Sequence, residues 1–124
     1  MDGYNNQPVS TAFDAVTLTA TAAGNQHTIE CGGMKTISFD VDYGGSNTMK
    51  LTLEHSPDGG TNWYSLVIDD TSTTSVITPR VWDMAATGKY NFIVNVAYKM
   101  LRVSVYESGG TGSTASVSYT QSGI

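Results

Sequence analysis

Residues 51–66 read LTLEHSPDGGTNWYSL, and this stretch decides the fold class of the chain. Leu51 and Leu53 alternate with polar residues before a run of turn-forming residues, and Tyr64 and Leu66 resume the alternation after it. Apolar residues two apart are the pattern of a strand with one face buried. The stretch therefore predicts two antiparallel strands joined by a tight turn.

The turn has the residues that a reversal of the chain requires. Pro57 presets the backbone for the second position of a type I turn, and Asp58 suits the third position. Gly59 can adopt the left-handed conformation of a bulged hairpin. The sequence thus predicts that residues 49–55 pair with residues 63–68.

The same alternation continues on both sides of this hairpin. Apolar residues recur at intervals of two in the following runs: Val16, Leu18, Ala20; Ile29, Cys31; Ile37, Phe39, Val41, Tyr43; Met49, Leu51, Leu53; Tyr64, Leu66, Ile68; Tyr90, Phe92, Val94, Val96; Leu101, Val103, Val105; and Ala115, Val117, Tyr119. About seven to nine short strands at regular spacing predict an all-β fold, a single antiparallel β-sandwich. The pattern leaves a jelly-roll order and an immunoglobulin-like order open.

Other breaks in the alternation predict further reversals. The glycine-rich segments 44–47 and 109–112 each predict a hairpin. Residues 82–88 fit either one helical turn that ends at Gly88 or an irregular crossover between sheets, and we expect little helix elsewhere.

Length and composition indicate one domain with an arm. A chain of 124 residues fits a single core and needs neither metal nor disulfide to fold. Residues 1–11 carry almost no apolar content, so we expect an extended N-terminal arm there and the sandwich over residues 12–124. Cys31 is the only cysteine, and its strand-like neighbours indicate a buried, unreactive thiol.

Charge and hydropathy exclude two classes of partner. The formal net charge of −5, with six scattered Lys and Arg residues, argues against nucleic acid. No apolar run approaches the roughly 20 residues that span a bilayer, and the N-terminus lacks signal-peptide features. We therefore expect no membrane partner, and we expect a protein that is made in the cytoplasm.

The candidate catalytic groups are few. His27 and His55 fall near predicted strand ends or turns, where a solvated imidazole is the usual state. Asp40 with Asp42 fits a solvated strand face, and Asp69 with Asp70 fits a turn.

The stretch from Asp40 resembles the first half of a calcium loop. Its twelfth position is Leu51, however, where a bidentate Glu is required. We expect a protein that is not an enzyme and that uses no cofactor or metal.

The turn and its flanking strands suggest a family. Residues 51–66, with Ser56-Pro57-Asp58-Gly59 followed by Trp63, resemble a hairpin of small β-sandwich domains in virion proteins of tailed phages. The resemblance extends to residues 98–106 and to the glycine-rich turn and strand that follow them. It implies a capsid decoration or auxiliary protein that binds the outside of the shell and stabilises it, or alternatively a tail, baseplate or fibre accessory domain. The implied partners are the major capsid protein, other virion proteins and other copies of the chain, with a trimer among the options.

Five residues are candidates for an interface. Tyr4, Pro8 and Val9 would make the contact of the arm, and Trp63 and Trp82 could contribute aromatic surface. The two tryptophans also fit rim packing of the sandwich. A third reading is a sugar-binding platform, which would make the chain a carbohydrate-binding β-sandwich module.

Overall fold

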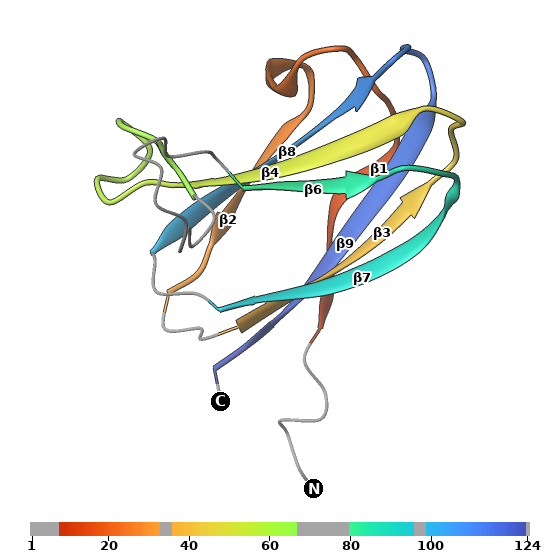
Figure 1. Ribbon diagram of the computed structural model, residues 1–124. Helices are drawn as coiled ribbons and strands as arrows, with labels where there is room; N and C mark the ends of the chain where they lie inside the picture. Colours follow the sequence, from red (N-terminus) through yellow and green to blue (C-terminus); the bar gives the residue numbers. More distant parts are fainter. Residues whose placement is uncertain (1–7, 33–35, 67–79, 96–98, 124) are drawn as a thin grey trace, which may run out of the picture.

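The computed structural model describes residues 8–32, 36–66, 80–95 and 99–123, and these form nine strands and one short 3-10 turn (Figure 1). The strands are β1 (Val9–Thr17), β2 (Gln26–Glu30), β3 (Thr36–Tyr43), β4 (Thr48–His55), β5 (Tyr64–Ser65), β6 (Val81–Met84), β7 (Gly88–Asn95), β8 (Met100–Ser108) and β9 (Thr114–Ser122). The turn η2 covers Ala22–Gly24. The prediction of an all-β chain is confirmed.

The strands form two antiparallel sheets that pack face to face. The first sheet has the order β1-β9-β3-β7, and the second has β2-β8-β4, with β5 and β6 both on the free side of β4. Antiparallel pairs are nested from the chain ends inward: β1 with β9, β2 with β8, β3 with β7 and β4 with β6. This nesting is the jelly-roll order, so the structure settles the topology that the sequence left open.

Alternation along the strands builds the core between the sheets. In β3 every second side chain is buried: Ile37, Phe39, Val41 and Tyr43 face the core, whereas Asp40 and Asp42 are exposed. The other buried apolar side chains of the predicted runs are Leu18, Ile29, Cys31, Met49, Leu51, Leu53, Leu101, Val103, Val105, Ala115, Val117 and Tyr119. Each large apolar side chain removed from water contributes about 1.5–3 kcal/mol, so this inner layer is the main source of stability.

A row of aromatic rings crosses the core from one sheet to the other. Trp82 on β6 stacks on Phe92 of β7 with 4.9 Å between ring centroids, and Phe92 stacks on Phe39 at 5.2 Å. Phe39 then contacts Tyr119, which lies 5.9 Å from the ring of His27 on β2. The row begins at β6 on one side of the second sheet, passes through β7, β3 and β9 of the first sheet, and ends at β2 on the other side of the second sheet. It therefore connects the two sheets along both of their sides.

The predicted hairpin around residues 56–60 is confirmed over the part that the structure describes. His55 pairs with Tyr64, Glu54 pairs with Ser65, and the amide of Leu66 donates to Leu53. Residues 67 and 68 lie outside the described residues. The first half of β4 pairs instead with β6, so two short strands share this side of β4.

Asp58 holds the turn together. Its carboxylate accepts hydrogen bonds from the backbone and side-chain amides of Asn62 at 2.8 and 2.6 Å and from the hydroxyl of Ser56 at 2.8 Å. These bonds lower the pKa of Asp58 to about 2. Gly59 has a φ of 76°, the left-handed conformation predicted for it.

The hairpin predictions for two other connections were wrong, and for a third segment, residues 82–88, one of the two predicted alternatives, the crossover between sheets, is correct in part. Residues 44–47 join β3 to β4 and residues 109–113 join β8 to β9, and in both cases the two strands lie in opposite sheets instead of forming a hairpin. Residues 81–84 are strand β6, so the helical turn is absent there and the chain crosses between the sheets at residues 85–87. Glycine and polar residues indicate a reversal, but they do not encode whether the next strand pairs with the last one or crosses the core.

The boundary of the arm also differs from the prediction. Val9, Ser10 and Thr11 belong to β1 and pair with Thr120, Tyr119 and Ser118. The segment 9–11 is therefore part of the first sheet, while residues 1–7 lie outside the part of the chain that the structure describes.

One end of the sandwich is closed around a buried carboxylate. The side chain of Glu107 on β8 is 1% exposed and accepts a hydrogen bond of 2.5 Å from the hydroxyl of Tyr43 and one of 3.4 Å from the amide of Ser113. Burial alone would raise the pKa of Glu107, but hydrogen bonds from Ser113, Tyr43 and Asn47 outweigh it and lower that pKa. Glu107 thus ties the loops 44–47 and 109–113 together.

Gly45 in the first of these loops has no room for a side chain. A Cβ at Gly45 would lie 2.3 Å from Ser113 Oγ and 2.5 Å from Tyr43 Oη, whereas a Cβ at Gly44 would meet its nearest neighbour at 3.5 Å. We expect Gly45→Ala to lower the free energy of unfolding by roughly 1–3 kcal/mol. Gly44→Ala is the matched control, and equal urea midpoints for the two variants would contradict the packing described here.

Glu107 also predicts a pH dependence of stability. Because its folded-state pKa is lowered, its contribution is present above the ordinary value of 4.5 and is lost as the pH falls through the folded-state value. We expect Glu107→Gln to cost about 1–3 kcal/mol at neutral pH and to flatten the loss of stability in acid. Denaturant unfolding at a series of pH values measures this, with the exposed Glu30→Gln as control. An unchanged acid slope in Glu107→Gln would refute the assignment.

Candidate functional site

The outer side of the first sheet is an ordered polar surface, which we call the polar face. Cross-strand pairing places its side chains in rows that run over β1, β9, β3 and β7. The rows are Val9, Thr120, Ser38 and Ile93; Thr11, Ser118, Asp40 and Asn91; and Ser116, Asp42 and Lys89. These residues all point outward because their strand neighbours fill the core.

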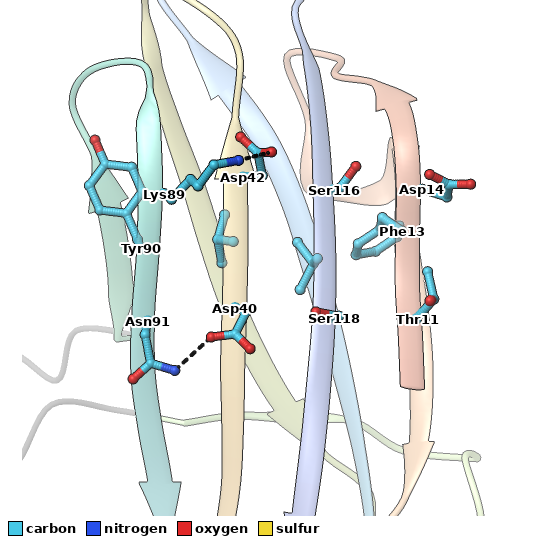
Figure 2. Close-up of a pocket in the computed structure, with 12 residues that line it drawn as sticks. Thr11, Phe13, Asp14, Asp40, Asp42, Lys89, Tyr90, Asn91, Ser116 and Ser118 are labelled. Atoms are coloured by element: carbon cyan, nitrogen blue, oxygen red, sulfur yellow. Dashed lines mark hydrogen bonds and ion pairs between the residues drawn. The ribbon is translucent and has the colours of Figure 1, made fainter. Parts of the chain in front are cut away.

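The polar face is hollowed at its centre. The hollow has a volume of about 590 Å³, and Figure 2 shows Asp40, Asp42, Ser116 and Ser118 along its middle. Phe13 lies at the β1 side and Tyr90 at the β7 side of the same view (Figure 2). The hollow thus extends over the whole width of the sheet.

Two pairs of polar side chains join β7 to β3 along the hollow. Lys89 Nζ lies 2.7 Å from Asp42 Oδ2, and Asn91 Nδ2 donates to Asp40 Oδ1 at 2.9 Å (Figure 2). The Lys89 and Asp42 side chains are 81% and 56% exposed, so solvent screens this pair and it contributes little to stability. The hollow is lined by three carboxylates, Asp14, Asp40 and Asp42, and by one ammonium group, that of Lys89, so the polar face is acidic in character.

Strand β1 is irregular where it borders the hollow. Its pairing with β9 shifts register between Thr11 and Phe13 and again between Phe13 and Val16. Ala15 has a φ of 47°, and its amide donates to Ser116 Oγ at 2.9 Å. Asp14 lies within the second of these register shifts and is one of the residues that line the hollow.

The structure separates the five predicted interface residues. Val9 is 66% exposed at the first row of the polar face, Pro8 precedes it and is exposed, and Tyr4 lies outside the described residues. Trp63 and Trp82 lie elsewhere, on the second sheet. The polar face therefore contains Val9 alone of the predicted aromatic and arm residues.

The two tryptophans are both covered. Trp82 stacks on Phe92, and the guanidinium of Arg80 lies 4.9 Å from its ring centroid. The guanidinium of Arg102 lies 4.3 Å from the ring centroid of Trp63, and Arg102 also pairs with Glu54 at 2.9 Å. Neither ring is a bare, flat platform, and this corresponds to the rim packing that the sequence favoured.

A second hollow lies on the outer side of the second sheet. It has a volume of about 330 Å³ and is lined by Arg80, Arg102, Glu54 and neighbouring small residues. Its cations are already engaged, Arg102 by Glu54 and Trp63 and Arg80 by Trp82. This second hollow therefore offers a ligand fewer unpaired charged groups than the polar face does.

The titratable residues considered for catalysis lie apart. His27 is half-buried, with Nε2 at 3.4 Å from the hydroxyl of Tyr119 and its ring against Phe13, so the prediction of a solvated imidazole was wrong. His55, at the end of β4, contacts the ring of Tyr64. Asp69 and Asp70 fall outside the described residues.

Two other features bear on metal or thiol chemistry. Within the described ranges, no group of three or more His, Cys, Asp or Glu side chains is placed to hold a metal ion. Cys31 is buried as predicted, and burial raises the pKa of its thiol.

The described residues contain no helix that is long and apolar enough to span a bilayer.

Sequence reasoning missed the polar face as a site. Its signal was present in the alternate Asp and Ser residues of 38–42 and 116–120, which we interpreted only as a solvated side. What the sequence lacks is the order β1-β9-β3-β7, which brings these four segments side by side.

Comparison with known proteins supports the fold. No protein-family model and no curated protein matches the sequence. Among solved structures, tripeptidyl peptidase 2 is similar with a TM-score of 0.56 and 10% identity over 94% of this chain, which spans only 10% of the peptidase. This likeness concerns the β-sandwich fold alone.

Two further solved structures are similar at a lower level. One is a carbohydrate-binding module, CBM28, specific for non-crystalline cellulose, with a TM-score of 0.47 and 10% identity over 87% of this chain and 72% of the module. The other is a disulfide-linked pilus of Bacillus endospore appendages, with a TM-score of 0.44 and 10% identity over 98% and 94% of the two chains. The strand order of the two sheets, and not these likenesses, defines the class of this chain as a jelly-roll β-sandwich domain.

Proposed function

We propose that this chain is a non-enzymatic structural protein of a tailed-phage particle, a capsid decoration protein that docks on the shell through the polar face. The observation that carries the proposal is the polar face itself, a hollowed surface four strands wide in which β9, β3 and β7 pair without a register shift. Its partner is the major capsid protein or another virion protein, and its role is to cover and stabilise the shell.

The chemistry of the polar face favours docking over catalysis. Its carboxylates lie on an open sheet surface, where Asp42 is paired with Lys89 and Asp40 with Asn91. Acid and base catalysis is most efficient with a group whose pKa is tuned by burial and neighbours to lie near the working pH, and carboxylates on an open, solvated surface do not have such surroundings. Many hydroxyl, amide and carboxylate groups in fixed rows instead suit a polar protein interface with bridging water.

The assignment to a phage particle has two supports. The turn at residues 56–63 resembles hairpins of tailed-phage virion domains, and Asp58, Asn62 and Ser56 are the residues that stabilise it here. The jelly-roll order is also common among viral capsid domains. A tail, baseplate or fibre accessory domain is the alternative position on the particle.

A carbohydrate-binding role is the second candidate. Jelly rolls include lectin domains, and Asp40, Asp42 and Asn91 offer paired acceptors and donors that suit sugar hydroxyls. Against it stands the aromatic surface: Trp63 is covered by Arg102, and Trp82 by Arg80 and Phe92.

Binding to phage shells that lack the protein tests the proposal. We expect saturable binding at symmetric positions, measured by sedimentation and then located by electron microscopy. Ser118→Tyr places a bulky side chain at the centre of the polar face, and we expect it to weaken binding by about tenfold or more. Tyrosine is favoured in strands, so the fold should be retained.

Thr28→Tyr is the matched control, because Thr28 is exposed on β2 and pairs with Arg102 on the outer side of the second sheet. Equal loss in both variants, or no loss in Ser118→Tyr, would count against docking through the polar face. Absence of shell binding combined with binding in a glycan screen would favour the carbohydrate role.

The acidic character of the polar face predicts a salt dependence. Three carboxylates and one ammonium group along the hollow suit a partner with basic side chains, and salt screens such attraction. We expect the association rate with shells to fall as ionic strength rises, and Asp40→Asn to reduce that slope. A rate that is independent of salt would exclude electrostatic docking at this surface.

A further inference from the structure

Three of the four sheet edges are protected against pairing with another chain. Strand β1 carries two register shifts and a left-handed Ala15, β2 has five residues, and the last edge is divided between the two residues of β5 and the four of β6. Bulges and short strands are the usual means by which proteins block such pairing.

Strand β7 lacks this protection. It has eight residues, Gly88–Asn95, that pair with β3 in eight consecutive positions without a shift. Among the strands that the structure describes, β3 is its only hydrogen-bonded neighbour, so its other edge is free of a strand. The segment contains no proline, and the charge of Lys89 is directed to Asp42 on β3.

The apolar side chains of β7 are also only partly shielded from water. Ile93 is 67% exposed on the outer side of β7, while Tyr90, Phe92 and Val94 on the inner side are only partly buried against the core. A strand that pairs here must place apolar side chains inward and polar side chains outward. Strand β7 has that alternation itself.

We propose that β7 of one copy pairs antiparallel with β7 of a second copy about a two-fold axis at Asn91. In this register Lys89 of each copy lies opposite Ile93 of the other, and Tyr90 lies opposite Phe92. The aliphatic stem of Lys89 covers exposed Ile93, and the aromatic pair extends the inner layer across the interface. The two first sheets become one continuous sheet of twice the width.

The charges and the area define the strength of this contact. The only charged side chain of β7 is Lys89, which Asp42 neutralises, so two-fold pairing brings no uncompensated like charges together. A single pair of edge strands covers less than the roughly 1,600 Å² of a standard interface. The dimer is therefore weak and concentration-dependent, and it does not depend on the proposed docking to a shell.

Sedimentation equilibrium over a wide range of protein concentration tests the proposal. The wild type should pass reversibly from monomer to dimer. Ile93→Lys sets a second ammonium group opposite Lys89 of the other copy, and we expect it to weaken dimerisation by about tenfold. Val9→Lys is the matched control, because Val9 has nearly the same exposure, 66%, in the same row of the polar face but on bulged β1.

A cross-link tests the axis. In Asn91→Cys the two thiols lie directly opposite, so oxidation should give a disulfide-linked dimer, while Val9→Cys should stay monomeric. Buried Cys31 does not interfere. Three results would overturn the proposal: a wild type that is monomeric throughout, equal weakening by Ile93→Lys and Val9→Lys, or no cross-link at position 91. Unchanged far-ultraviolet circular dichroism and thermal midpoint establish that each variant is folded.

Discussion

The two-residue period of the strands is the constraint on which the rest of the structure depends. Burial of Phe39 and Val41 in the core obliges Asp40 and Asp42 to face outward, and the same holds for Val117 between Ser116 and Ser118. A shift of one residue would bury Asp40 and Asp42 in β3, and it would bury Ser116 and Ser118 in β9. The core and the polar face are therefore two consequences of one register.

The two sheets are held in place by contacts of two different kinds. In the middle of the strands the row from Trp82 through Phe92 and Phe39 to Tyr119 joins the sheets by ring packing. At one end of the sandwich a buried carboxylate, Glu107, accepts hydrogen bonds from two glycine-rich loops. Apolar packing tolerates small changes of geometry, whereas the hydrogen-bonded end requires all of its partners. The loops that cross between sheets are thus fixed by polar contacts rather than by strand pairing.

The polar face and the edge of β7 belong to one sheet, and together they describe how the domain meets other molecules. The face offers exposed, mutually paired polar groups, and the edge offers unpaired backbone with a partly covered apolar margin. Ile93 belongs to both surfaces, because it ends the first row of the polar face and lies on the edge strand β7. Contact through the edge leaves the centre of the face accessible, so pairing of two copies and docking through the face are compatible.

The sequence by itself determined the all-β class, most of the strands and their core residues, and the turn at Asp58, because alternation and turn chemistry are local and each is encoded within about ten residues. It missed the start of β1 at Val9 and the whole of β6. It did not determine that β1 pairs with β9, that residues 44–47 cross the core, or that residues 81–84 pair with β4, since these depend on which distant strand competes best for an edge. Only the tertiary structure places Asp40 beside Ser118 and Asn91, and covers Trp63 and Trp82 with arginines. The site is a product of long-range pairing, which no short stretch of sequence contains.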